Sequence, residues 1–136
     1  MHLKKKVLNG VSNAFERIGL TKSMTYPRLD AFMKKYASET LALNIGCGKT
    51  NFIQYYPNQK MTDVEVRDGM RVDIVADAHD MSVIPDGSFE LVLCTEVLEH
   101  LHTPQKAIDE MHRILKPGGL LLLTTRFVFP LHSSPV

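Results

Sequence analysis

The chain has little cysteine, no long apolar run and almost no net charge. Its two cysteines, Cys47 and Cys94, are too few for the disulfide framework of a small secreted protein, so each is predicted to be a small buried residue in a reducing compartment. No apolar run is longer than that from Leu120 to Leu123, far below the roughly 20 residues of a membrane span, and no apolar signal segment follows the basic start. These absences predict a cytoplasmic protein without a membrane span.

Charge is unevenly distributed, although the 136 residues sum to a net charge of only +1. Residues 1–36 hold eight basic side chains against Glu16 and Asp30, whereas residues 61–100 hold ten acidic side chains against Arg67 and Arg71. Apolar residues at helical spacing over 7–18, and a second helix over 27–36 with Pro27 at its start, predict a helical N-terminal cap at 1–38. A basic helical pair also suits an acidic membrane surface or a nucleic acid, but the cap is favoured and no nucleic-acid partner is expected.

The most informative segment is residues 41–48, an apolar strand that ends on a Gly-x-Gly turn. A short continuous apolar run is typical of a strand buried on both faces of a parallel sheet. Gly46 and Gly48 at its carboxyl end allow a sharp turn and the close approach of a ligand, with Cys47 between them. We expect a nucleotide-like ligand at this end of the sheet.

Three ligand classes use such a turn, and each pattern is missed by one position. A Walker loop, which would indicate nucleotide hydrolysis, needs glycine where Leu43 stands inside the strand. A dinucleotide fingerprint needs a small residue where Asn51 stands, and a methyl-donor turn needs glycine at Thr50. A tight turn without any ligand remains the fourth possibility, so the downstream sequence has to decide.

Strands and connectors alternate after the turn, which predicts a mostly parallel α/β sheet with flanking helices. The helix predicted over 104–115 has Thr103 as its cap and Pro104 at its first position, and residues 116–119 are predicted to end it and turn the chain. The six residues 66–71 are too few for an ordinary parallel crossover, so the second strand ends early or that crossover lacks its helix. The expected later strands cover residues 60–65, 72–76, 89–94 and 120–125.

Two acidic positions follow predicted strands where a nucleoside would bind. Asp63 lies at the end of the second strand, near the position of a ribose-binding carboxylate, and Glu65 on the same strand face competes with it. Asp77 and Ala78 follow the third strand, where a carboxylate and an amide can meet the adenine amino group and ring nitrogen. Asp77 is also a good helix cap.

These segments together resemble the ordered motifs of class I S-adenosylmethionine-dependent methyltransferases, the methyltransferase type 11-like domain in particular. The resemblance covers about residues 41–125 and implies a Rossmann-like fold with S-adenosyl-L-methionine as cofactor. It implies that Gly46, Cys47 and Gly48 lie against the methionine part of the donor, that Asp63 holds the ribose and that Asp77 with Ala78 reads adenine. Cys94 and Thr95 would line the donor's floor. The motifs are LNIGCG from Leu43, DVE from Asp63, VDIVADAHD from Val72, PDGSFELV from Pro85, EVLEH from Glu96 and LKPGG from Leu115.

The sequence departs from this family in three places. Asn44 stands where many members carry an acid near the donor's amino group, and Thr50 replaces the third glycine. The family's last two strands are also missing, and the tail at 127–136 with its two prolines cannot supply them. We therefore expect a binding core at 39–126 that is a truncated chain, a fragment, or a minimal domain whose open sheet edge is covered by an oligomer or partner.

The sequence predicts methyl transfer to an unidentified acceptor, a small molecule or a sugar or lipid precursor. The alternative is a non-catalytic nucleoside-binding or partner-binding module. No catalytic residue is assigned, because several side chains are conceivable bases and an isolated histidine rarely identifies itself. No zinc pattern supports a metal site. The conceivable bases are His79, Glu96, His100, His102 and His132.

Overall fold

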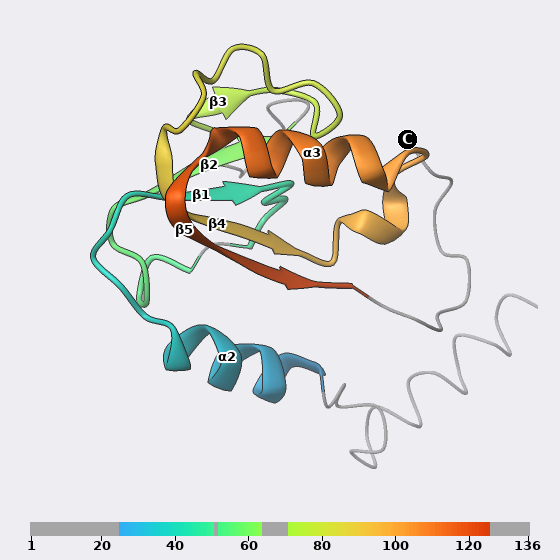
Figure 1. Cartoon of the computed structure of the whole chain (residues 1–136). Helices are drawn as coiled ribbons and strands as arrows, with labels where there is room; N and C mark the ends of the chain where they lie inside the picture. The colour runs from blue at the N-terminus through green and yellow to red at the C-terminus, as the bar shows by residue number, and fades with distance from the viewer. Residues whose placement is uncertain (1–24, 51, 64–70, 126–136) are drawn as a thin grey trace, which may run out of the picture. The chain divides into compact units, whose positions relative to one another are not determined.

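The computed structural model describes residues 25–50, 52–63 and 71–125 (Figure 1). The chain divides into two compact units, Met1–Tyr36 and Ala37–Val136. In the first unit, α2 (Thr25–Lys35) begins two residues before the predicted Pro27. The rings of Phe32 and Tyr36, one helical turn apart, meet edge to face with their centroids 5.3 Å apart. The helix predicted over 7–18 lies outside the described residues, and the predicted domain boundaries stay a prediction.

The second unit contains a five-stranded sheet in the order β3-β2-β1-β4-β5, in which every neighbouring pair is parallel. This confirms the predicted Rossmann-like α/β class. Strand order reverses between β1 and β4, because the chain first builds the sheet in one direction and then returns to the other side of β1. The strands are β1 (Ala42–Ile45), β2 (Gln59–Asp63), β3 (Ile74–Val75), β4 (Phe89–Thr95) and β5 (Leu115–Thr124).

The central strands are buried as the continuous apolar runs predict. All four residues of β1 are buried, and β4 is buried at every position from Leu91 to Cys94. Ile45 at the end of β1 is in register with Cys94 near the end of β4. Both cysteines are buried, as expected, and no disulfide joins them.

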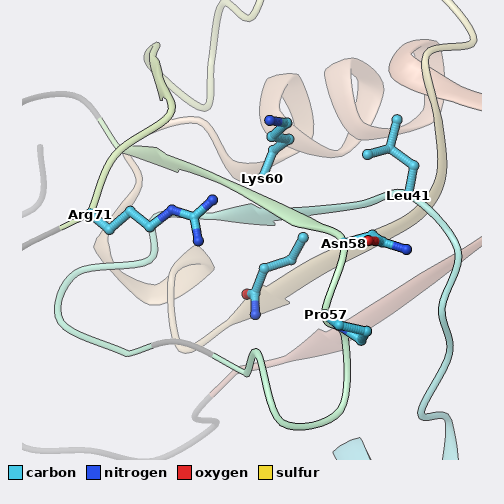
Figure 2. A pocket seen from close by; sticks show the side chains of 6 residues that line it. Leu41, Pro57, Asn58, Lys60 and Arg71 are labelled. Atoms are coloured by element: carbon cyan, nitrogen blue, oxygen red, sulfur yellow. The ribbon is translucent and has the colours of Figure 1, made fainter.

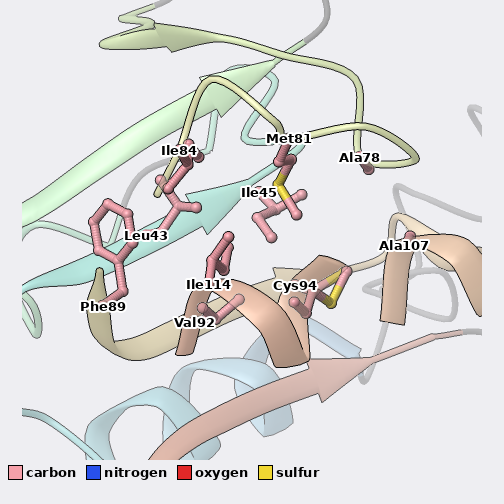
Figure 3. Packing of buried hydrophobic residues seen from close by; sticks show 11 residues of the cluster. Leu43, Ile45, Ala78, Met81, Ile84, Phe89, Val92, Cys94, Ala107 and Ile114 are labelled. Carbon is pink, nitrogen blue, oxygen red and sulfur yellow. The ribbon is translucent and has the colours of Figure 1, made fainter. Parts of the chain in front are cut away.

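One face of the sheet packs against α3 (Pro104–Ile114), which lies along the strands and runs in the opposite direction in Figure 1. Ala107, Met111 and Ile114 project from a single face of α3 and are fully buried. They join sheet residues such as Val92 and Ile45 in one cluster, shown in Figure 3. Complete burial of each large apolar side chain contributes about 1.5–3 kcal/mol, so this face fixes α3 on the sheet.

The start of α3 differs in one respect from the prediction. Thr103 occupies the position before the helix, but its side chain makes no capping hydrogen bond. Its carbonyl oxygen instead accepts the backbone N–H of Lys106 at 3.0 Å. Pro104 at the first position has no N–H to satisfy, which reduces the need for a side-chain cap.

The last strand begins earlier than predicted. Residues 116–119 belong to β5, which runs from Leu115, although they were expected to form a turn between helix and strand. Their irregularity remains visible, because Leu115 is opposite Phe89 whereas Leu120 is opposite Leu91. Gly118, with φ of 77°, allows this bulge in the strand.

The short strands β2 and β3 end the sheet on its other side. β2 is described from Gln59 to Asp63, and its predicted last residues, Val64 and Glu65, lie outside the described residues, whereas β3 is only Ile74–Val75 rather than 72–76. Asp73 supports this edge, because its Oδ2 accepts the Met61 N–H at 2.8 Å. Residues 64–70, which contain most of the short crossover and Glu65, lie outside the described part.

A loop before β4 is fastened to α3 by Arg113. Its guanidinium donates to the carbonyl oxygens of Met81 at 2.9 Å and Ile84 at 2.8 Å. It also forms ion pairs with Glu110 at 2.8 Å and Asp86 at 2.6 Å. The hydrogen bond from Arg113 is the main cause that lowers the pKa of Glu110. The hydrogen bonds to Glu110 and then to Asp86 raise the pKa of Arg113. The loop that follows β3 is therefore held in a fixed place beside the helix.

Candidate functional site

The Gly-x-Gly turn lies at the carboxyl end of β1, next to the point where the strand order reverses. Parallel sheets bind ligands in the crevice at this reversal, because the chains leaving β1 and β4 turn to opposite sides there. Gly46 has φ of 58° and Gly48 has φ of 51°. Both values lie in the left-handed region that glycine adopts without a steric penalty. The turn therefore depends on both glycines.

The two glycines have different surroundings. A Cβ at Gly46 would lie 2.7 Å from Cγ2 of Val97, closer than real side chains approach. Among the described residues, a Cβ at Gly48 would meet nothing within 4 Å. Gly46 thus allows the ends of β1 and β4 to pack together, whereas at Gly48 no described residue blocks the approach of a ligand to the backbone.

The structure brings Asp63 to this turn. Asp63 ends β2 and is buried, and its Oδ2 accepts the backbone N–H of Gly48 at 3.1 Å. The N–H of Cys47 donates to the carbonyl oxygen of Thr62 at 3.2 Å. A carboxylate is thereby fixed beside the glycines, at the end of the neighbouring strand. Its competitor Glu65 lies outside the described residues.

Asn44 contributes an unusual polar group beneath the turn. The residue is 1% exposed, and its Nδ2 donates to the carbonyl oxygen of Thr50 at 3.3 Å. Within the described residues its Oδ1 is buried without a hydrogen-bond partner. An unsatisfied buried acceptor is costly, so Asn44 lowers the stability of the strand that carries the turn.

Asp77 and Ala78 follow β3, one strand beyond Asp63. Ala78 is buried and packs in the core cluster. Asp77 is exposed and caps no helix, because its Oδ1 accepts the N–H of His79 at 2.8 Å and lies 2.7 Å from Nδ1 of the same residue. These hydrogen bonds, the backbone one foremost, lower the pKa of Asp77. It is a carboxylate at neutral pH with a fixed orientation.

Cys94 and Thr95 end β4 beside the turn. Cys94 is fully buried, and burial, together with the charge of Glu99, raises the pKa of its thiol to about 12. It is therefore no nucleophile at neutral pH. Thr95 is half-buried and in register with Thr124 of β5.

Glu96, a conceivable base from the sequence, directly follows β4 and has a backbone conformation that sequence reasoning missed. It has φ of 57°, although it is not a glycine. Its N–H donates to the Thr124 carbonyl oxygen at 2.9 Å, and its Oε1 accepts the Thr124 hydroxyl at 3.1 Å. Strained residues of this kind gather at functional sites. A glutamate does not indicate a left-handed backbone, so only its place after the predicted strand end could have directed attention to this position.

Two hollows lie at the opposite end of the strands. One, of about 370 Å³, is shown in Figure 2 and is lined by Leu41, Pro57, Asn58, Gln59, Lys60 and Arg71. Leu41 and Asn58 directly precede β1 and β2, so this hollow is at their amino ends. A larger hollow of about 620 Å³ surrounds residues 116–119, at the amino ends of β4 and β5. Neither contains a residue of the predicted donor site.

The described residues contain no group of three or more histidine, cysteine or acidic side chains that could hold a metal ion. Glu96, His100 and His102 therefore do not form such a group among these residues. Among the same residues, no helix is long and apolar enough to cross a membrane.

Comparisons with known proteins agree with this geometry. A family model described as "Methyltransferase domain" matches residues 43–123. A thiol S-methyltransferase of Rattus norvegicus is 33% identical over 106 residues, which are 65% of this chain and 43% of that protein. The chain spans 43–44% of the length of the curated relatives that it matches first.

Solved structures show the same fold. A SAM-dependent methyltransferase of Thermotoga maritima matches with a TM-score of 0.62 and 25% identity, covering 81% of this chain and 56% of the other. A 1,6-didemethyltoxoflavin-N1-methyltransferase of Burkholderia thailandensis, solved with S-adenosylhomocysteine, matches with a TM-score of 0.59 and 15% identity, covering 88% and 61%. The latter likeness concerns the fold alone.

Proposed function

This chain belongs to the class I S-adenosylmethionine-dependent methyltransferases, and from that premise we propose that it binds S-adenosylmethionine and transfers the methyl group to a small-molecule acceptor. Candidate acceptors are a small metabolite and an activated sugar or lipid precursor. Three relatives are named as thiol S-methyltransferases, which supports a small-molecule acceptor, whereas a further relative, 26% identical over 134 residues, is named for a tRNA uridine.

The observation that carries the proposal is the hydrogen bond between Gly48 and Asp63 at the reversal of strand order. It fixes a carboxylate at 3.1 Å from the amide of a glycine whose outer side is open. A carboxylate can accept from two neighbouring hydroxyl groups, as a ribose presents them. The same turn can therefore hold the ribose through Asp63 and the methionine part against Gly46, Cys47 and Gly48.

The residues present fit the donor at two further points. The ionised Asp77, with the amide of Ala78, suits the amino group and ring nitrogen of adenine. The ends of β4 at Cys94 and Thr95 suit the floor of the site. Asn44, which stands in place of an acid, is buried with its Oδ1 and offers the donor's ammonium group no exposed acceptor.

When bound, the donor supplies a methyl group on a sulfonium that is already an activated leaving group. The protein then has to hold the acceptor in line behind that methyl group and exclude water. A base is required only for an acceptor that loses a proton. Among the conceivable bases, Glu96 lies at the end of β4 beside the turn, but its carboxylate is bonded to Thr124, so we assign it no catalytic role.

Isothermal titration of the chain with S-adenosylmethionine and S-adenosylhomocysteine tests the proposal. We expect saturable binding that weakens about tenfold or more in Asp63→Asn, because the amide keeps one acceptor for Gly48 but loses the second carboxylate oxygen. Asp109→Asn, which alters an exposed carboxylate on α3, is the matched control and should bind normally. The absence of heat at millimolar donor in the wild type would refute the proposal.

Binding and catalysis are separate questions for this chain. Donor binding without methyl transfer to a panel of acceptors, together with a stable complex with another protein, would favour the alternative of a non-catalytic module. β5 pairs with β4 along one side only within the described residues, and an oligomer or partner along its other side stays a prediction, as does a cytoplasmic location.

A further inference from the structure

His79 joins two segments that are far apart in the chain. Its Nδ1 lies 2.7 Å from Asp77 Oδ1, and the backbone N–H of Thr103 donates to its Nε2 at 3.4 Å. Because Nε2 acts as an acceptor, the ring proton is on Nδ1, which donates it to the carboxylate. The imidazole is only 19% exposed and uses both nitrogens. It therefore has no free lone pair with which to take a proton from an acceptor, although it is a conceivable base by residue type.

The carboxylate of Asp77 is held asymmetrically. The backbone N–H and the Nδ1 of His79 both bond to Oδ1, at 2.8 and 2.7 Å. In the described part of the chain, Oδ2 receives no hydrogen bond, and the side chain is 56% exposed. One oxygen is therefore fixed by the protein, and the other keeps its lone pairs for an external donor.

Thr103 supplies the anchor for this arrangement. It directly precedes α3, whose buried face fixes it on the sheet, so its backbone is a rigid support. Through the Nε2 contact the ring cannot rotate about its attachment without losing a hydrogen bond. Asp77 is thus positioned by α3, through His79 and Thr103, as well as by β3.

We infer that His79 is a positioning residue for recognition of the donor's base: its ring, held between Thr103 and Asp77, turns Oδ2 of Asp77 outward to accept a hydrogen bond from the exocyclic amino group of adenine. This inference rests on the proposed function. It assigns His79 no part in the chemical step.

The test uses three substitutions that separate the two ring nitrogens. The amide nitrogen of Asn lies near the position of Nδ1, so His79→Asn retains a donor for Asp77. The amide of Gln reaches the position of Nε2, so His79→Gln retains a partner for Thr103 but not the donor. His79→Ala removes both.

The probes are S-adenosylhomocysteine and S-inosylhomocysteine, which has a carbonyl oxygen in place of the exocyclic amino group, both measured by isothermal titration. For S-adenosylhomocysteine we expect His79→Ala and His79→Gln to bind about tenfold more weakly, one lost hydrogen bond, and His79→Asn to bind within about threefold of the wild type. For S-inosylhomocysteine we expect no weakening in any variant, because there is no amino group for Oδ2 to accept from.

The outcomes distinguish the two levels of the argument. A wild type that binds S-adenosylhomocysteine and a His79→Ala variant that equals it overturn the role of His79 alone. Equal weakening for both nucleosides also overturns it, because general loss of structure affects both. A wild type that binds no S-adenosylhomocysteine overturns the proposed function and this inference with it. If His79→Ala does not fold, as judged by circular dichroism, equal affinities of the Asn and Gln variants overturn the inference.

Discussion

Substitution of Gly46 by alanine is the sharpest test of how the donor turn is built. The new methyl group would lie 2.7 Å from Val97 Cγ2 and 3.1 Å from Cγ1, and the backbone would keep φ near 58°. The left-handed conformation costs alanine about 1–2 kcal/mol, and the overpacking costs about 1–3 kcal/mol more. We therefore expect Gly46→Ala to lower the free energy of unfolding by about 2–5 kcal/mol, measured by urea denaturation.

Two partner variants separate these contributions. Gly48→Ala has nothing within 4 Å of its new Cβ, so it should lose only the conformational part, about 1–2 kcal/mol. Val97→Ala removes both offending methyl groups and leaves its Cβ 3.5 Å from the new methyl, an ordinary contact. The double variant of Gly46 and Val97 should then be more stable than the sum of the single effects by about 1–3 kcal/mol.

The result that would refute this reasoning is additivity. If the two single effects simply add in the double variant, the methyl groups of Val97 are not what excludes a side chain at position 46. Equal losses of stability in Gly46→Ala and Gly48→Ala would also contradict it. Donor affinity tests the two positions independently of stability. Gly48→Ala should weaken binding of the donor, because its methyl group enters the space that the proposed donor fills.

The remaining predictions concern the stability and its pH dependence in Arg113→Met and the reactivity of Cys94. Arg113→Met should lower the free energy of unfolding by about 2–3 kcal/mol, because it leaves the carbonyl groups of Met81 and Ile84 without their donor, and thermal or urea unfolding checks this. Because the pKa of Glu110 is lowered from 4.5 in the folded protein, its ionised carboxylate adds stability above pH 4.5, and this stability is lost as the pH falls through the folded-state pKa. Arg113→Met should therefore make the loss of stability on the acid side less steep. An unchanged loss would contradict the role of Arg113 in lowering this pKa. Cys94, with a pKa of about 12 and no exposure, should resist iodoacetamide at pH 8 until the protein unfolds, as mass spectrometry can show.

Burial and turn chemistry made much of this fold predictable from the sequence. The apolar run into Gly46 predicted a strand buried on both faces, and Pro104 predicted the first residue of α3. The start of β5 was predicted wrongly because Pro117 and Gly118 are typical of turns, while the bulge opposite β4 lets them remain in the strand. Such tertiary pairing overrides local propensity.

The candidate site was predictable where it depends on strand order and not where it depends on side-chain partners. Asp63 could be placed beside Gly48, because adjacent parallel strands end at the same edge of the sheet. In the bridge from Asp77 through His79 to Thr103, the last two residues are 24 positions apart in the sequence, and no local pattern indicates their contact. The orphaned oxygen of Asn44 likewise follows from its exact neighbours rather than from its residue type.

The left-handed backbone of Glu96 means that selection for folding and selection for activity can favour different residues at this position. Glycine adopts φ of 57° without steric cost, so a library screened for folding alone should drift toward glycine at position 96. A library screened for methyl transfer would keep an acid there only if its carboxylate contributes to the site. Position 96 is thus where the fitness landscapes of folding and of activity can diverge, and sequencing the survivors of both screens would show in which direction each one moves.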